Sequence, residues 1–164
     1  MTTVERLQER FPAGITRVEQ FRDNQRLIVR AGDVFAILRH LKDDAGFDML
    51  IDITCVDYLE YPDATDRFGV IYCVLNLSTG ERLVLKTMLN EPELTLPSAV
   101  PLWKGADWME REVYDMYGIE FEGHPDLRRI LMPEEFSAFP LRKDYPLRGR
   151  GERHNFDVIA RSDS

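Results

Sequence analysis

The densest group of side chains able to bind a metal or move protons lies between residues 110 and 126. It comprises six carboxylates and one imidazole: Glu110, Glu112, Asp115, Glu120, Glu122, Asp126 and His124. On a helix, Glu112 and Asp115 would share one face and Glu110 would point elsewhere. With His124, those two carboxylates are a candidate metal site that a stand-alone hydrolase could use to activate water.

The same residues also fit an ion-pairing role. A zinc protease helix carries two histidines at i and i+4 around a glutamate, whereas His124 stands alone and precedes Pro125. Arg111 lies four residues before Asp115, and Arg128 and Arg129 follow the acidic cluster. We favour ion pairing, and the metal-dependent hydrolase stays the alternative.

Other kinds of chemistry lack their motifs. Gly149 and Gly151 follow no strand pattern, so they do not form a G-x-G-x-x-G dinucleotide site, and no P-loop or G-x-S-x-G motif occurs. Cys55 and Cys73 are too few for an iron–sulfur cluster or a zinc site and lie in apolar strand-like runs. We therefore expect no catalytic, cofactor-binding or metal-binding residue in this chain.

Charge and hydropathy narrow the range of partners. A net charge of −8 disfavours binding to nucleic acid. Seven basic and four acidic residues lie between Arg128 and Arg153, which fits either an acidic partner or a solvated tail. No run approaches the roughly 18 apolar residues of a membrane helix, and the first ten residues do not resemble a signal peptide. We expect a protein on the cytoplasmic side that reaches a membrane only through partners.

The helices and strands predicted from the sequence, which must position these residues, indicate an α+β fold. Apolar spacing predicts helices over residues 4–11, from Val34 to before Gly46, and over 106–117. Runs rich in β-branched and aromatic residues predict strands over 15–21, 26–30, 49–58, 68–77 and 82–89. This order predicts a mixed or antiparallel sheet flanked by helices.

The C-terminal quarter has a different composition. The helix over 106–117 has one apolar stripe and ends at Gly118. From Gly123 onward, four prolines permit only short helices. We therefore divide the chain into a core domain, residues 1–122, and an extended arm, residues 123–164, which docks on partner subunits.

Two blocks resemble a known family. They are E-R-E-x-x-D-x-x-G-I over residues 110–119 and G-H-P-D-L-R-R over residues 123–129, with Trp103, Phe121 and residues 140–146 beside them. The run from Gly46 to Tyr58 is also similar, so the likeness spans most of the chain. The sequence resembles the 30-kilodalton subunit family of respiratory complex I, the proton-pumping NADH:quinone oxidoreductase. Only the loops at residues 99–101 and 137–139 depart from the usual pattern.

The resemblance implies a non-catalytic subunit of a membrane-associated, proton-translocating complex. Members of the family carry no cofactor of their own, so FMN and the iron–sulfur clusters are expected in partner subunits. Those partners would be the large quinone-site subunit and the iron–sulfur subunits. Related hydrogenases and plastoquinone-linked dehydrogenases use similar subunits, which leaves the electron donor open.

The resemblance also assigns structural roles to two groups of residues. The first would fix the junction of helix, turn and arm: Glu110, Arg111, Glu112, Asp115, His124, Asp126, Arg128 and Arg129. The second would dock the arm on the large neighbouring subunit: Arg142, Lys143, Asp144 and Tyr145. Charge reversal at Arg128 and Arg129 is expected to reduce assembly and to leave the isolated domain folded.

Overall fold

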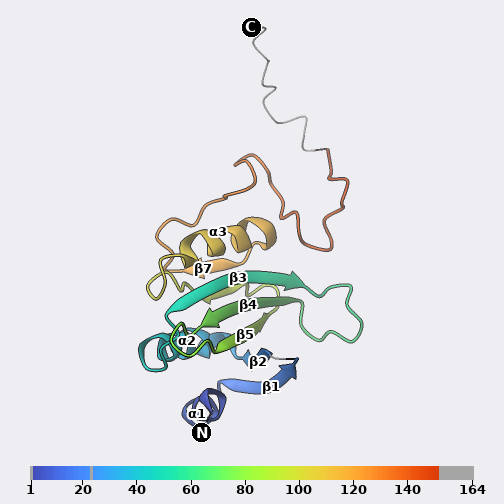
Figure 1. Cartoon of the computed structure of the whole chain (residues 1–164). Coiled ribbons are helices and arrows are strands. Elements are labelled where there is room, and N and C mark those ends of the chain that lie inside the picture. The colour runs from blue at the N-terminus through green and yellow to red at the C-terminus, as the bar shows by residue number, and fades with distance from the viewer. Residues whose placement is uncertain (1, 23, 152–164) are drawn as a thin grey trace.

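The computed structural model describes residues 2–22 and 24–151 (Figure 1). The expected arm residues 152–164 lie outside the described residues. The helices are α1 (Thr3–Arg10), α2 (Val34–Asp43), α3 (Ala106–Tyr117) and the short 3-10 helix η1 (Ala31–Asp33). The strands are β1 (Ile15–Phe21), β2 (Asn24–Val29), β3 (Met49–Asp57), β4 (Phe68–Leu75), β5 (Arg82–Leu89), β6 (Thr95–Pro97) and β7 (Glu120–Glu122).

Five of these strands form one mixed sheet in the order β1-β2-β5-β4-β3. The β2–β5 pair is parallel, and the other neighbouring pairs are antiparallel. The prediction of an α+β fold with a mixed sheet flanked by helices is therefore confirmed. The parallel pair arises because α2, β3 and β4 intervene between β2 and β5 along the chain.

The pairing of β6 with β7 was not predicted. These strands are three residues each and run parallel, with Leu96 opposite Phe121. Pro97 ends β6, and the nearby prolines led us to expect irregular structure there. Proline is tolerated at the edge of so short a sheet because its missing N–H need not enter the ladder.

The helices follow their apolar spacing. Thr2 and Glu5 form a reciprocal capping box that begins α1. The predicted stripe on α2 is buried through Val34, Ile37, Leu38 and Leu41. On α3, Ala106, Val113 and Met116 are buried as expected, and Gly118 ends the helix in the left-handed region with φ 76°.

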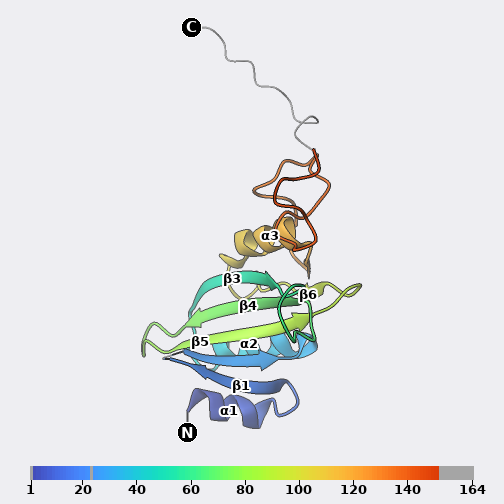
Figure 2. The same ribbon diagram turned by 90° about the vertical axis from the view of Figure 1, so that its right-hand side faces the viewer.

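The helices and the sheet share one core. Figure 2 shows α2 behind the sheet, α1 beside β1 and α3 beyond β3 at the opposite edge. Alternate side chains of the central strands point to α2 and join its stripe, among them Tyr72, Val74, Leu83 and Leu85. The arm then leaves β7, passes over α3 and descends toward the end of β3 (Figure 1).

Candidate functional site

Helix α3 carries two fully buried carboxylates, Glu110 and Asp115, on different sides. Buried charges are rare and need partners, because burial removes the hydration that stabilises the ionised form. The five-residue spacing directs the two side chains to different neighbours. Asp115 bonds to the arm, whereas Glu110 bonds to the loop that follows β6.

Asp115 fixes the start of the arm. Its Oδ1 accepts a hydrogen bond from Nη1 of Arg129 at 2.6 Å. Its Oδ2 accepts three backbone N–H bonds, from Ile130 at 3.1 Å, Leu131 at 2.7 Å and Met132 at 2.8 Å. One carboxylate thereby orders three consecutive peptide groups and one guanidinium.

These bonds determine the ionisation of Asp115. Burial acts to raise the pKa, but the N–H groups of residues 130–132 and the guanidinium of Arg129 together lower the pKa below its ordinary value of 3.8. Asp115 is therefore a carboxylate at neutral pH. Its charge is held inside the chain and is not offered to an external ligand.

Arg111 does not pair with Asp115, so that part of the ion-pair prediction is wrong. Its Nε donates to the carbonyl of Arg128 at 3.2 Å, and its Nη2 donates to the carbonyl of Arg129 at 3.0 Å. Asp115 turns inward toward the arm backbone, while Arg111 approaches the same segment from outside. Arg111 and Asp115 thus bind the carbonyl and N–H groups of one stretch of arm.

Glu110 fixes the loop before α3. The hydroxyl of Ser98 donates to Oε2 at 2.7 Å, and the N–H of Ala99 donates to Oε1 at 2.6 Å. Burial raises the pKa of Glu110, and these two neutral donors offset only part of that effect. Sequence spacing placed Glu110 away from Glu112 and Asp115 but gave no sign that it is buried.

His124, Asp126 and Arg128 lie in the turn with which the arm begins after β7. The buried ring of His124 accepts from the N–H of Asp126 at Nδ1, at 3.0 Å, and its Nε2 lies 3.1 Å from the carbonyl oxygen of Asp107. The ring therefore connects the turn to the first turn of α3. Arg128 pairs with Asp126 at 2.8 Å, and both side chains are mostly exposed.

A second set of ion pairs holds the far part of the arm on the core. The guanidinium of Arg67 contacts buried Asp57 at 3.2 Å and Asp144 at 3.0 Å. The backbone N–H of Lys143 donates to Asp57 at 2.9 Å. Arg142 donates to the carbonyl of Tyr117 at 2.6 Å and pairs with Glu91 at 2.8 Å. The arm is thus bound to this chain's own core at residues 142–144.

The positions of the second predicted group follow from these contacts. Arg142 and Asp144 engage this chain, and Lys143 does so through its backbone while its side chain is exposed. The ring of Tyr145 meets Phe136 edge to face at 5.7 Å. Sequence reasoning missed Asp57, Arg67 and Glu91, because the Lys143–Asp57 bond spans 86 residues of chain. The available sign in the sequence was Asp57, an acidic residue at the end of the largely apolar strand β3.

Gly118 gives the arm room to pass. Its φ of 76° favours glycine, and a Cβ there would lie 2.6 Å from the Phe139 ring and 2.9 Å from Nη2 of Arg142. Arg142 also lies over the Phe139 ring at 4.7 Å. Gly118 therefore both ends α3 and leaves the space into which Phe139 and Arg142 of the arm pack.

The alternative metal site is not assembled. Glu112 is exposed, Asp115 bonds to the arm, and His124 turns toward Asp107. Within residues 2–22 and 24–151, no three His, Cys, Asp or Glu side chains are placed to hold a metal ion. The predicted Glu112, Asp115 and His124 group does not converge on one point.

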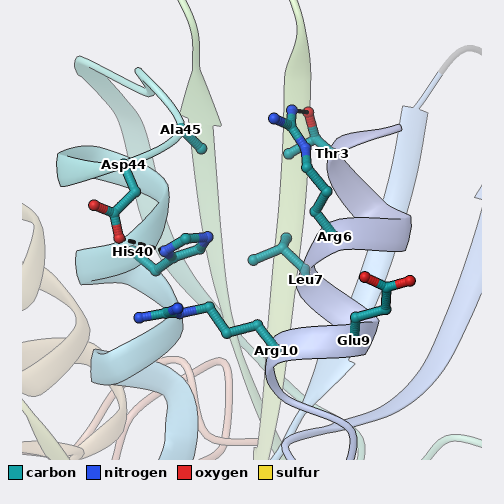
Figure 3. Close-up of a pocket in the computed structure, with 8 residues that line it drawn as sticks. All are labelled: Thr3, Arg6, Leu7, Glu9, Arg10, His40, Asp44 and Ala45. Carbon is teal, nitrogen blue, oxygen red and sulfur yellow. Dashed lines mark hydrogen bonds and ion pairs between the residues drawn. The ribbon is translucent and has the colours of Figure 1, made fainter. Parts of the chain in front are cut away.

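A separate hollow lies between α1 and α2. It has a volume of about 380 Å³ and is lined by Arg6, Arg10, His40 and Asp44 among others (Figure 3). His40 on α2 pairs with Asp44, the residue that follows this helix, and Arg10 extends beneath the imidazole (Figure 3). None of the predicted site residues lines this hollow.

Comparison with known proteins gives a consistent match. Residues 27–151 match the family described as "Respiratory-chain NADH dehydrogenase, 30 Kd subunit". A NADH-quinone oxidoreductase subunit of Trichlorobacter lovleyi is 45% identical over 148 residues, 90% of this chain and 90% of that protein. Another NADH-quinone oxidoreductase subunit, of Caulobacter vibrioides, is 45% identical over 82% of this chain and 68% of its own length.

Two solved structures share the fold. A trypsin-resistant fragment, residues 1–134, of Nqo5 is 36% identical with a TM-score of 0.69, covering 77% of this chain and all of that one. A chain of the membrane-bound sulfane sulfur reductase, an archaeal respiratory membrane complex, has a TM-score of 0.75 at 23% identity. It covers 98% of this chain and 93% of its own.

Proposed function

This chain belongs to the family of the respiratory-chain NADH dehydrogenase 30 Kd subunit, and from that premise we propose a scaffolding role. The chain is a cofactor-free subunit in the peripheral arm of a proton-translocating NADH:quinone oxidoreductase. Residues 123–164 dock on the large quinone-site subunit and on the iron–sulfur subunits. Electrons pass from NADH to quinone through FMN and clusters that those partners hold.

The observation that carries this proposal is an arm whose backbone is fixed inside the chain while its leucines face outward. Leu131 is 63% exposed and Leu141 is 49% exposed, although the N–H of Leu131 donates to Asp115 and the N–H of Leu141 donates to the carbonyl of Met116. Trp108 on α3 is also exposed, at 69%. Preordered apolar side chains of this kind suit a protein interface, because less conformational entropy is lost on docking.

The proposed location is the cytoplasmic side of the cell inner membrane, reached through the other subunits. No helix of the described residues has the length and apolar character needed to cross a membrane. The core of residues 1–122 carries the fold, and the arm carries most of the contacts to partners. The name of the trypsin-resistant Nqo5 fragment, residues 1–134, supports such a division in that relative.

The test is a tagged chain recovered from detergent-solubilised membranes and run on a native gel stained for NADH dehydrogenase activity. Wild-type chain is expected in a large assembly that oxidises NADH. Leu131→Asp is expected to shift most of the chain to a small species without lowering the melting temperature of the isolated chain. Leu77→Asp, at a leucine 62% exposed in the loop between β4 and β5, is the matched control and is expected to assemble normally.

Other outcomes decide against the proposal or change it. A large assembly that stains for hydrogenase in place of NADH oxidation would change the electron donor and keep the scaffolding role. A wild-type chain recovered only as a small species would contradict the scaffolding role. Equal assembly of Leu131→Asp and Leu77→Asp would contradict the docking role of the arm.

A further inference from the structure

No helix of residues 2–22 and 24–151 covers the face of the sheet turned away from α2. Figure 2 looks onto this face and shows α2 behind it. Paired residues on neighbouring strands point to the same side, so the register identifies its members. Val84 pairs with Cys73 and Arg26, and Lys86 pairs with Ile71 and Ile28. We call these six residues the open face.

The open face is more apolar than a solvated face requires. A sheet that faces water on one side alternates apolar inward and polar outward residues. Here the outward residues of β4 and β5 include Ile71, Cys73, Leu75, Val84 and Met88, and each is only half-buried. This pattern indicates a layer supplied from outside the chain.

A fixed cation lies in the middle of this apolar surface. Nζ of Lys86 donates to the Tyr58 hydroxyl at 2.7 Å and lies 4.2 Å from the centre of its ring. Gly69 lies beneath them, since a Cβ there would come within 2.7 Å of Lys86 Cε and 2.9 Å of the Tyr58 ring. The missing side chain at Gly69 lets the lysine stem and the tyrosine ring lie flat on the sheet.

The charges on this side of the sheet are unbalanced. Within the described part of the chain, Lys86, Arg26 and Arg82 form no ion pair, whereas Arg17 pairs with Glu19 at 2.9 Å. Arg26 instead lies over the ring of Phe21 at 4.6 Å. The same register places two acids on this side, Glu19 opposite Arg26 and Asp52 opposite Cys73, and Glu19 is held by Arg17. Cations therefore outnumber acids on this side of the sheet, on a chain whose net charge is −8.

We propose that the open face binds an amphipathic helix of a partner subunit, with carboxylates beside its apolar stripe placed to meet Lys86 and Arg26. The apolar stripe covers Ile28, Ile71 and Val84. This inference deepens the proposed function, because the helix belongs to a subunit of the same complex. It adds a second interface, on the side of the sheet opposite α2, that does not include the arm's leucines.

The two cysteines report directly on this interface. Cys73 belongs to the open face and is partly accessible, whereas Cys55 points into the core, where burial raises its pKa to about 12. Iodoacetamide would be added at mildly alkaline pH to the isolated full chain and to the native-gel complex, with modification measured by mass spectrometry. Cys73 is expected to react at least about tenfold more slowly in the complex, and Cys55 serves as the unreactive reference in both.

The outcomes separate this inference from the proposed function. Equal Cys73 reactivity in the isolated chain and in the assembled complex would overturn the interface and leave the scaffolding role intact. A chain missing from the complex would overturn the scaffolding role. Protection of Cys73 that grows with the concentration of the isolated chain would show that a second copy of the chain covers the open face. It would overturn the proposal that a partner subunit's helix does so.

Charge variants test the carboxylates. Lys86→Glu is expected to reduce the assembled fraction several-fold. Arg39→Glu makes the same charge change at an exposed residue of α2 and is expected to assemble normally. Lys86→Met removes only the charge and keeps an apolar stem. It therefore tests the requirement for partner carboxylates even if Lys86→Glu fails to fold. Assembly of Lys86→Met and Arg39→Glu at the wild-type level would overturn the requirement for partner carboxylates.

Discussion

The two sides of α3 each hold a buried carboxylate, and the pKa values of the two carboxylates shift in opposite directions. Both Asp115 and Glu110 are inaccessible to solvent. Asp115 accepts from a guanidinium and three N–H groups, and its pKa falls. Glu110 accepts from one hydroxyl and one N–H, and its pKa rises. Lack of solvent exposure therefore does not by itself determine ionisation; the number and the charge of the donors also act on the pKa.

The difference separates two structural tasks. On the arm side, a charged carboxylate organises a proline-rich segment that forms no helix or strand over residues 123–151. On the loop side, the carboxyl closes a short turn that β6 and β7 already hold through three residue pairs. The arm therefore depends on Asp115 more than the loop depends on Glu110.

The largest effect is expected for Asp115→Asn. The change removes one partner of a buried ion pair and leaves Arg129 with the Asp115 backbone carbonyl and the carbonyl of Ala138. We expect a loss of about 3–5 kcal/mol in the free energy of unfolding, measured by urea denaturation of the full chain. Asp126→Asn breaks an exposed pair and is the control, with an expected loss below about 1 kcal/mol. Equal losses would contradict the distinction between buried and exposed partners.

Gly118→Ala is expected to have the next largest effect. The new methyl group would stand in the left-handed region and meet Phe139, so strain adds to displacement of the arm. We expect a loss of about 1–3 kcal/mol and faster tryptic cleavage after Arg142 and Lys143. Gly32→Ala, where a Cβ meets no atom within 4 Å, is the control. A wild-type cleavage rate in Gly118→Ala would show that the arm does not depend on this packing.

Much of this arrangement could be predicted from residue types and spacing. The strands from 49 to 89 and α3 followed from alternation and from the apolar stripe that ends at Gly118. The roles of Asp115 and Arg111 could not be predicted, because i to i+4 spacing suggests a direct pair between them. Only the path of the arm shows that each binds backbone groups of residues 128–132 instead. The parallel β2–β5 pair was likewise not specified, since alternation does not determine strand order.

The pH dependence of stability is expected to differ between the two sides, with a smaller effect than either substitution above. The folded pKa of Asp115 lies below its unfolded value of 3.8. Its stabilisation is therefore fully present above that value and is lost as the pH falls through the folded pKa. The difference in unfolding free energy between wild type and Asp115→Asn should shrink over that acid range. Urea denaturation followed by circular dichroism at several pH values measures this difference in unfolding free energy. A difference that stays constant with pH would contradict an ionised Asp115.

Glu110→Gln is expected to have the smallest effect and to depend on pH with the opposite sign. Because the folded pKa of Glu110 is raised above its ordinary value of 4.5, its favourable contribution is present below that value. It is lost as the pH rises through the folded pKa. The amide oxygen of Gln can still accept from Ala99, so we expect a change within about 1 kcal/mol at neutral pH. Relative to wild type, Glu110→Gln should gain stability from acid to neutral pH, as measured by urea denaturation. A loss of stability at neutral pH as large as that of Asp115→Asn would mean that the loop side needs the charge as much as the arm side.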